Sequence, residues 1–121
     1  MTNRDYLETV ASEKFIHLTT TGRRSGRMHM VELWFAIGDG VVYLSHEGEE
    51  TDWMRNIKAN VQVSFWIGGK NFAGNAHYLE HQTEEAWAGK VALYEKYYGK
   101  ASKEVIEDWF SLSRLVVIET S

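Results

Sequence analysis

The sequence predicts an α+β domain in which six mostly antiparallel strands form a closed or partly closed barrel with helices around it. Short stretches rich in β-branched and aromatic residues recur along the chain, and glycine turns separate them. The apolar spacing typical of helices is found near the N-terminus, in the middle and late in the chain. The 121 residues are enough for one hydrophobic core and too few for two. We therefore expect one domain that spans residues 1–121.

The composition, 44% hydrophobic and 25% charged, is that of an ordinary soluble globular protein. The chain has no cysteine, which excludes disulfides, thiolate metal sites and thiol redox chemistry. Any redox reaction therefore needs a bound cofactor. The net charge of −4 argues against broad nucleic-acid binding. Because we recognise no signal peptide and no apolar run long enough to span a bilayer, we expect a cytoplasmic protein without a transmembrane segment.

The first predicted elements are a helix and three strands. Residues 2–13 have the apolar spacing of a short amphipathic helix. Residues 15–20 are β-branched and aromatic, and residues 28–37 alternate as a long second strand. A glycine-rich hairpin turn at 38–40 then leads into a third strand at 41–45. We expect these three strands to form a meander.

The second half of the chain predicts three helices and three strands. In order, they are a helix at 52–59, strands at 61–67 and 70–79, helices at 83–98 and 102–110, and a sixth strand at 115–118. On the helix at 52–59, Trp53, Asn56 and Ile57 share one face. The residues of helix 83–98 expected to face the core are Ala86, Trp87, Val91 and Tyr94. The pairs Glu84-Glu85 and Glu95-Lys96 are expected on its solvated face.

A basic loop connects the first two predicted strands. Gly22 and Gly26 bound it, and both can take the positive φ that brings backbone N–H groups close to a ligand. The polar side chains of this stretch are Thr21, Arg23, Arg24, Ser25 and Arg27. Guanidinium groups suit phosphate because their planar forks donate paired, charge-assisted hydrogen bonds. The loop thus predicts an anion site, and the alternative is a solvated hairpin tip with surface arginines.

Four features that follow one another along the chain extend this interpretation. They are Thr20-Thr21-Gly22-Arg23-Arg24-Ser25-Gly26, Leu33, Ser45 and Trp53-Met54-Arg55-Asn56-Ile57-Lys58-Ala59-Asn60. In order and spacing, over about a third of the chain, they resemble the deazaflavin (F420)-dependent nitroreductase and quinone reductase family. This family is a branch of the FMN-binding split-barrel superfamily. The combined match is much more specific than any of its parts.

The resemblance implies a six-stranded split β-barrel, usually a homodimer, that holds a tricyclic redox cofactor. It also implies an oxidoreductase that passes hydride from reduced F420 to an electron-poor quinone, nitro compound or enone. In such a site the cofactor carries the chemistry and the protein supplies orientation and electrostatics. No catalytic side chain is therefore assigned. Five tryptophans, six tyrosines and five phenylalanines fit this expectation, because aromatic residues favour subunit interfaces and ring-binding pockets.

The resemblance also implies roles for particular residues. Arg23, Arg24 and Ser25 would hold the phosphate of the cofactor. Met30, Ser45 and His46 would border its ring system, and Trp53 and Asn56 would position the helix beside it. The complete predicted cofactor-binding set is Thr21, Gly22, Arg23, Arg24, Ser25, Gly26, Arg27, His29, Met30, Ser45, His46, Trp53 and Asn56. The scattered histidines His17, His77 and His81 are interpreted as structural, and no metal site is predicted.

The chain departs from the family pattern at several positions. Met28-His29 stands where Pro-Arg is common, Glu32 where a proline is common, and His46 where a lysine is frequent. Histidines thus replace two cationic contacts, and Arg27 is placed to compensate for one. FMN, whose single phosphate Arg23 and Arg24 would satisfy, is therefore the alternative to F420. A non-catalytic carrier or sensor that binds flavin or haem is the alternative outside enzymes.

Overall fold

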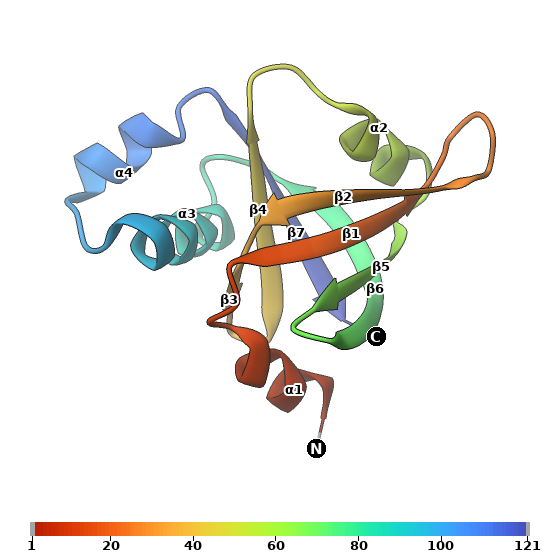
Figure 1. Cartoon of the computed structure of the whole chain (residues 1–121). Coiled ribbons are helices and arrows are strands. Elements are labelled where there is room, and N and C mark those ends of the chain that lie inside the picture. The colour runs from red at the N-terminus through yellow and green to blue at the C-terminus, as the bar shows by residue number, and fades with distance from the viewer. Residues whose placement is uncertain (1, 121) are drawn as a thin grey trace.

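The computed structural model describes residues 2–120, in which seven antiparallel strands form one sheet and four helices lie around it (Figure 1). The strands are β1 (Phe15–Thr21), β2 (Met28–Trp34), β3 (Ala36–Gly38), β4 (Val41–Glu47), β5 (Gln62–Ile67), β6 (Lys70–Leu79) and β7 (Ser113–Thr120). The helices are α1 (Asn3–Val10), α2 (Asp52–Ala59), α3 (Glu84–Tyr98) and α4 (Lys103–Trp109). The predicted α+β class is therefore confirmed, whereas the predicted number of strands is wrong.

The additional strand arises because the predicted strand at 28–37 breaks at Phe35. The strand order is β2-β1-β5-β6-β7-β4-β3, so β2 and β3 lie at opposite edges although one residue separates them. Phe35 is fully buried, and its N–H donates to the hydroxyl of Tyr97 on α3 (3.0 Å). The chain thus passes from one edge of the sheet to the other at Phe35. The predicted meander is correspondingly divided: β1 pairs with β2, and β3 pairs with β4.

The sheet is curved around a core but is not closed by a continuous ladder. On β1 the buried side chains alternate, as expected for a strand with one face on a core. The side chains at the centre of this core include Ile16, Leu18, Leu44, Phe65, Ile67, Val116 and Ile118. Leu7 of α1 and Ile57 of α2 join the same cluster. Each fully buried aliphatic side chain contributes about 1.5 to 3 kcal/mol to stability, so this cluster is the main stabilising feature of the barrel.

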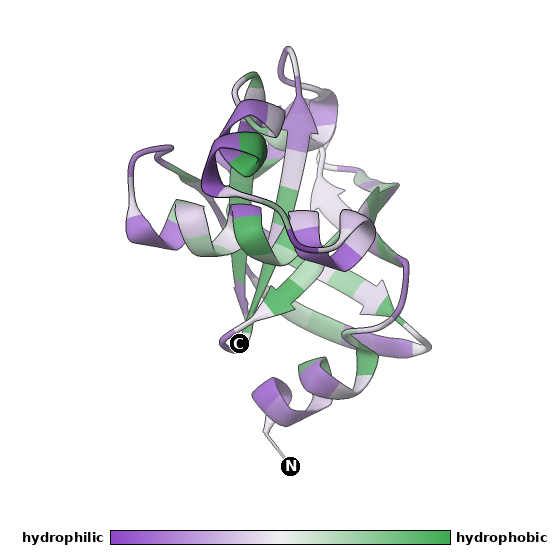
Figure 2. Ribbon diagram, turned by 90° about the vertical axis from the view of Figure 1, so that its left-hand side faces the viewer, coloured by the Kyte–Doolittle hydropathy of each residue, from purple (hydrophilic) through white to green (hydrophobic). Residues whose placement is uncertain are grey.

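A second cluster lies on the outside of the sheet, where α3 and α4 cover β3, β4 and β7 (Figure 2). Of the α3 residues expected to face the core, Ala86 is buried, and Trp87, Val91 and Tyr94 lie at the margin of the cluster. The other buried positions of α3 are Gly89, Lys90 and Leu93. The Lys90 ammonium is 1% exposed and pairs with Glu107 of α4 (3.1 Å). All four predicted residues thus lie in or against the cluster, and the prediction was incomplete because α3 is covered from two sides, by the sheet and by α4.

The ends of the elements follow local hydrogen bonds. Thr2 caps α1 in a capping box with Asp5, and the helix ends at Val10, earlier than the predicted residue 13. Strand β7 is longer than predicted because it pairs with both β4 and β6. Among the helices of residues 2–120, none is both long enough and apolar enough to cross a membrane.

Candidate functional site

The loop between β1 and β2 is closed by its own hydrogen bonds. The N–H of Gly22 donates to the carbonyl of Arg27 (2.7 Å), and the N–H of Gly26 donates to the carbonyl of Gly22 (2.9 Å). The Ser25 hydroxyl accepts from the N–H of Arg27 (3.1 Å). Gly26 has a φ of 72°, as predicted. Gly22 lacks a positive φ, contrary to the prediction. A side chain at this position would be too close to its neighbours, because a Cβ there would lie 2.8 Å from Nε2 of His29.

Arg23 connects this loop to α2. Its backbone N–H and its Nη1 both donate to Oδ1 of Asn56 (3.2 and 2.9 Å). Its Nη2 pairs with Oδ1 of Asp52 (3.2 Å) at the start of α2. Asn56 is buried and donates through Nδ2 to the hydroxyl of Thr20 on β1 (3.1 Å). The loop, the helix and the strand are therefore held in one hydrogen-bonded arrangement.

Beside this arrangement is a hollow of about 230 Å³. Its lining residues are Gly22, Arg23, Arg24, Ser25, His29, Asp52 and Asn56. Within residues 2–120, the backbone N–H groups of Arg24 and Ser25 donate to no protein acceptor, and Arg24 makes no ion pair. An exposed guanidinium next to unengaged N–H groups is a suitable environment for an anion.

A separate group of side chains holds the chain segment that precedes α2. Glu50 accepts a hydrogen bond from the Tyr78 hydroxyl (2.6 Å) and pairs with Lys58 of α2 (2.6 Å). The hydrogen bond from Lys58 and the one from Tyr78 lower the pKa of Glu50. Burial and the Glu50 carboxylate raise the pKa of Tyr78. Both shifts favour the charged carboxylate and the neutral phenol, which is the arrangement that anchors α2 to β6.

The structure brings only part of the predicted set together. Trp53 is on the buried side of α2, while Ser45 and His46 lie near the end of β4, outside the hollow. Met30 is 66% exposed and points to the outer face of β2, opposite to His29. Ser45, His46 and Met30 as ring contacts therefore stay a prediction.

Met30 on β2 and Ser45 and His46 on β4 lie on strands that each have an unpaired edge. Within residues 2–120, β2 pairs only with β1, and β4 pairs with β3 only through residues 41–43. The far edge of β2 and the 44–47 edge of β4 thus carry N–H and C=O groups without ladder partners. The two strands contact each other, and Figure 1 shows α2 above β2. Unpaired N–H and C=O groups of a strand edge are available for hydrogen bonds to another group.

Sequence reasoning missed two members of the Arg23 arrangement. Asp52 was expected only as the first residue of the helix at 52–59, and Thr20 only as part of a motif. The alternation of β1 holds the available signal, because it places Thr20 on the buried face, where a hydroxyl needs a partner. No comparable pattern in the sequence pairs Asp52 with Arg23.

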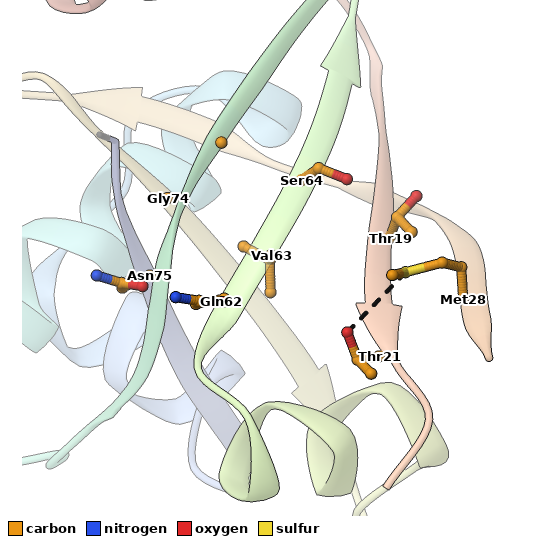
Figure 3. A pocket seen from close by; sticks show the side chains of 9 residues that line it. Thr19, Thr21, Met28, Gln62, Val63, Ser64, Gly74 and Asn75 are labelled. Carbon is orange, nitrogen blue, oxygen red and sulfur yellow. Dashed lines mark hydrogen bonds between the residues drawn. The ribbon is translucent and has the colours of Figure 1, made fainter. Parts of the chain in front are cut away.

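A larger hollow of about 430 Å³ lies on the outer face of the sheet (Figure 3). Its lining residues are Thr19, Thr21, Met28, Gln62, Val63, Ser64, Ala73, Gly74 and Asn75, none of which is ionisable. The Thr21 hydroxyl lies 3.9 Å from Sδ of Met28 in this hollow. Thr21 therefore faces away from the hollow of about 230 Å³ beside Arg24, which we call the anion hollow, and it lines only the larger one of the two.

The comparison with protein families bears on the whole of this region. The sequence model of the F420H(2)-dependent quinone reductase family matches residues 4–106. This chain belongs to that family. The matched range contains the loop at 22–27, β4 and α2, and it therefore confirms the resemblance that the motifs indicated.

Several solved structures share the fold of this quinone reductase family member. The conserved hypothetical protein Rv2991 from Mycobacterium tuberculosis is 22% identical, with a TM-score of 0.79 over 99% of this chain and 81% of its own. The F420-H2 dependent reductase FDR-A is 24% identical, with a TM-score of 0.70 over 88% of this chain and 94% of its own. HutZ, the heme storage protein from Vibrio cholerae, is 17% identical, with a TM-score of 0.73 over 100% of this chain and 92% of its own. At these identities the likeness shows a shared fold. No curated protein matches the chain.

Proposed function

We propose that this protein is an oxidoreductase that binds F420 and passes hydride from its reduced form to an electron-poor quinone, nitro compound or enone. The observation that carries the proposal is the anion hollow beside α2, which lies inside the segment matched by the F420H(2)-dependent quinone reductase family. We further infer that residues 1–121 form a single cofactor-binding domain. Reduced F420, when bound, would supply the hydride.

The residues at the hollow fit the phosphate of such a cofactor. The guanidinium of Arg24 and the N–H groups of Arg24 and Ser25 are free to donate to phosphate oxygens. His29 lies at the same hollow and supplies a further polar contact. The protein contributes by orienting the ring against the acceptor and by excluding water, and no side chain is required as an acid or base.

One observation favours FMN as the second candidate. Two arginines line the hollow, and Arg23 is already paired with Asp52. Within residues 2–120, only the guanidinium of Arg24 is therefore free for a ligand at this hollow. The stretch 46–52 contributes further negative charge through Glu47 and Glu49, whereas Glu50 is paired with Lys58. A cofactor with a single phosphate suits this charge balance better than one with a longer anionic tail.

We also propose that the protein is a cytoplasmic homodimer. The outer face of β2, β1 and β5 carries five exposed large apolar side chains. They are Phe15, Met28, Met30, Trp34 and Trp66, and Met28 is 70% exposed. Large exposed apolar areas on a soluble protein are typical of interaction surfaces. A second copy of this chain is the occupant that we propose for this outer-face patch.

Paired equilibrium titrations with F420 and FMN, followed by cofactor fluorescence at fixed salt, test the cofactor. Tight F420 binding with weak FMN binding is expected, and the reverse result would assign a flavin protein. Absence of binding to both at micromolar concentration contradicts the proposal. Turnover is tested separately, by comparing the reoxidation of the reduced cofactor by menadione with and without protein. Binding without faster reoxidation would identify a carrier or sensor.

A further inference from the structure

We propose that Arg23 and Arg24 have different tasks: Arg23 positions the loop through Asn56, and Arg24 is the guanidinium that binds the phosphate. This division rests on the proposed function for the identity of the ligand. It does not follow from the motif, in which the two arginines are adjacent and chemically equivalent.

Both polar atoms of the Asn56 side chain form hydrogen bonds. Its Oδ1 accepts from the N–H and Nη1 of Arg23, and its Nδ2 donates to Thr20. Asn56 and Thr20 are each 1% exposed, so water cannot replace a missing partner. Loss of the Arg23 guanidinium would remove the shorter of the two hydrogen bonds to Oδ1 of Asn56 and leave the backbone N–H of residue 23 as its donor. Arg23 is thus required by the protein itself.

The two arginine side chains differ in the charges that surround them. The Arg23 guanidinium is 26% exposed and lies 3.2 Å from the Asp52 carboxylate. This carboxylate offsets the positive charge that a phosphate would otherwise meet. Arg24 is exposed and has no acidic partner within residues 2–120. Its charge and its donors are therefore available to a ligand.

The backbone N–H groups of residues 23–25 differ in their hydrogen bonding. The N–H of Arg23 is engaged by Asn56, while those of Arg24 and Ser25, the next two residues, are not. By fixing the backbone at residue 23, Asn56 also fixes the direction in which the next two N–H groups point. A positioning role for Arg23 predicts that its loss weakens binding indirectly, by releasing these donors from their arrangement.

The test compares Arg23→Lys, Arg24→Met and Asn56→Ala, with the doubles Arg23→Lys/Asn56→Ala and Arg24→Met/Asn56→Ala. Arg24→Met should weaken FMN and F420 binding about 10- to 100-fold, the loss expected for a charge-assisted contact, and should leave the ligand-free Tm unchanged. Arg23→Lys keeps the charge but not the fork, because an ammonium cannot serve Asn56 and Asp52 in the same geometry. It should lower the ligand-free Tm and also weaken binding.

The double variants separate positioning from direct contact. If Arg23 acts through Asn56, Arg23→Lys/Asn56→Ala binds no more weakly than Asn56→Ala alone. The losses of Arg24→Met and Asn56→Ala should instead multiply. The division is overturned if the losses of Arg23→Lys and Asn56→Ala multiply, or if Arg24→Met binds as the wild type does. If Asn56→Ala does not fold, Thr20→Val, which removes only the hydroxyl that anchors Asn56, takes its place.

A control separates this inference from the proposed function. If the wild-type protein binds neither F420 nor FMN, the proposed function fails. Inorganic phosphate then serves as the probe, and its effect on Tm should be present in the wild type and lost in Arg24→Met. Absence of a phosphate effect on the wild type, or its persistence in Arg24→Met, overturns the role of Arg24.

Discussion

Lys96 of α3 places an ammonium group over an aromatic ring inside the protein. Its Nζ lies 3.5 Å from the ring centroid of Phe35, is buried, and has no hydrogen-bond partner within residues 2–120. The sequence predicted Lys96 on a solvated face together with Glu95, and only Glu95 is exposed. Burial lowers the pKa of Lys96 from 10.5 to about 8, although the Glu13 carboxylate opposes the shift. Folding therefore has to accommodate a poorly solvated charge at neutral pH.

Lys96→Met should raise the Tm at neutral pH and remove part of its pH dependence. In the wild type, the unfolded chain binds more protons at Lys96 than the folded protein does between pH values of about 8 and 10.5. The free energy of unfolding should accordingly rise with pH through this window, and the penalty is complete below about 8. Thermal unfolding of both proteins across the window measures the difference. Parallel curves would contradict the role of Lys96.

Tyr97→Phe should destabilise the bend at Phe35. The Tyr97 hydroxyl accepts from the N–H of Phe35 and lies 2.9 and 2.8 Å from the carbonyl oxygens of Phe35 and Lys14. Its removal leaves a buried N–H without a partner, at a cost of about 1 to 3 kcal/mol. Urea unfolding measures this free energy. Tyr98→Phe, at a residue that is 49% exposed, is the matched control and should have little effect.

At the scale of single elements, α3 depends on a glycine where it crosses β4. A Cβ at Gly89 would lie 2.7 Å from Cδ1 of Tyr43, whose ring is buried against the helix. Gly89→Ala should therefore destabilise the protein, although alanine is the better helix former by about 1 kcal/mol. Ala88→Gly on the exposed face should cost about that same amount through propensity alone. A stabilised Gly89→Ala variant in thermal unfolding would show that α3 can move away from β4 easily.

The strands were easier to predict than the break between β2 and β3. Alternation is a local property, and β2 shows it from Met30 to Trp34. What interrupts the ladder at Phe35 is the hydroxyl of Tyr97, a group far away along the chain. A pattern read over a few residues cannot contain such a partner, so the strand was predicted as continuous.

The candidate site shows the same limit. The motif from Thr20 to Gly26 and the helix residue Asn56 were predicted to act together, and hydrogen bonds join them in the structure. Pairing of Arg23 with Asp52 was not foreseen, because two adjacent arginines look alike in a sequence. Burial and partners, which distinguish them, arise only when α2 packs against the loop.

For the whole molecule, the outer-face patch predicts the state of association. Replacing Met28 and Met30 together with glutamate should give a monomer, because two carboxylates would be desolvated in the proposed interface. Light scattering at several concentrations measures the mass. Val105→Glu on α4, at an exposed apolar residue outside the patch, should leave the dimer intact. A dimer that survives the paired substitution would place the interface elsewhere.

The order of the strands also constrains how the protein can be made by a ribosome. β7 lies between β6 and β4, and it is the last strand of the chain that the structure describes. Until residues 113–120 emerge, a nascent chain has one ladder of β2, β1, β5 and β6 and a separate hairpin of β3 and β4. Tyr97, which holds the bend between them, also emerges late. The sheet is therefore completed only after residues 113–120 have been made, and a chain that stops before β7 is expected to expose both ladders to aggregation.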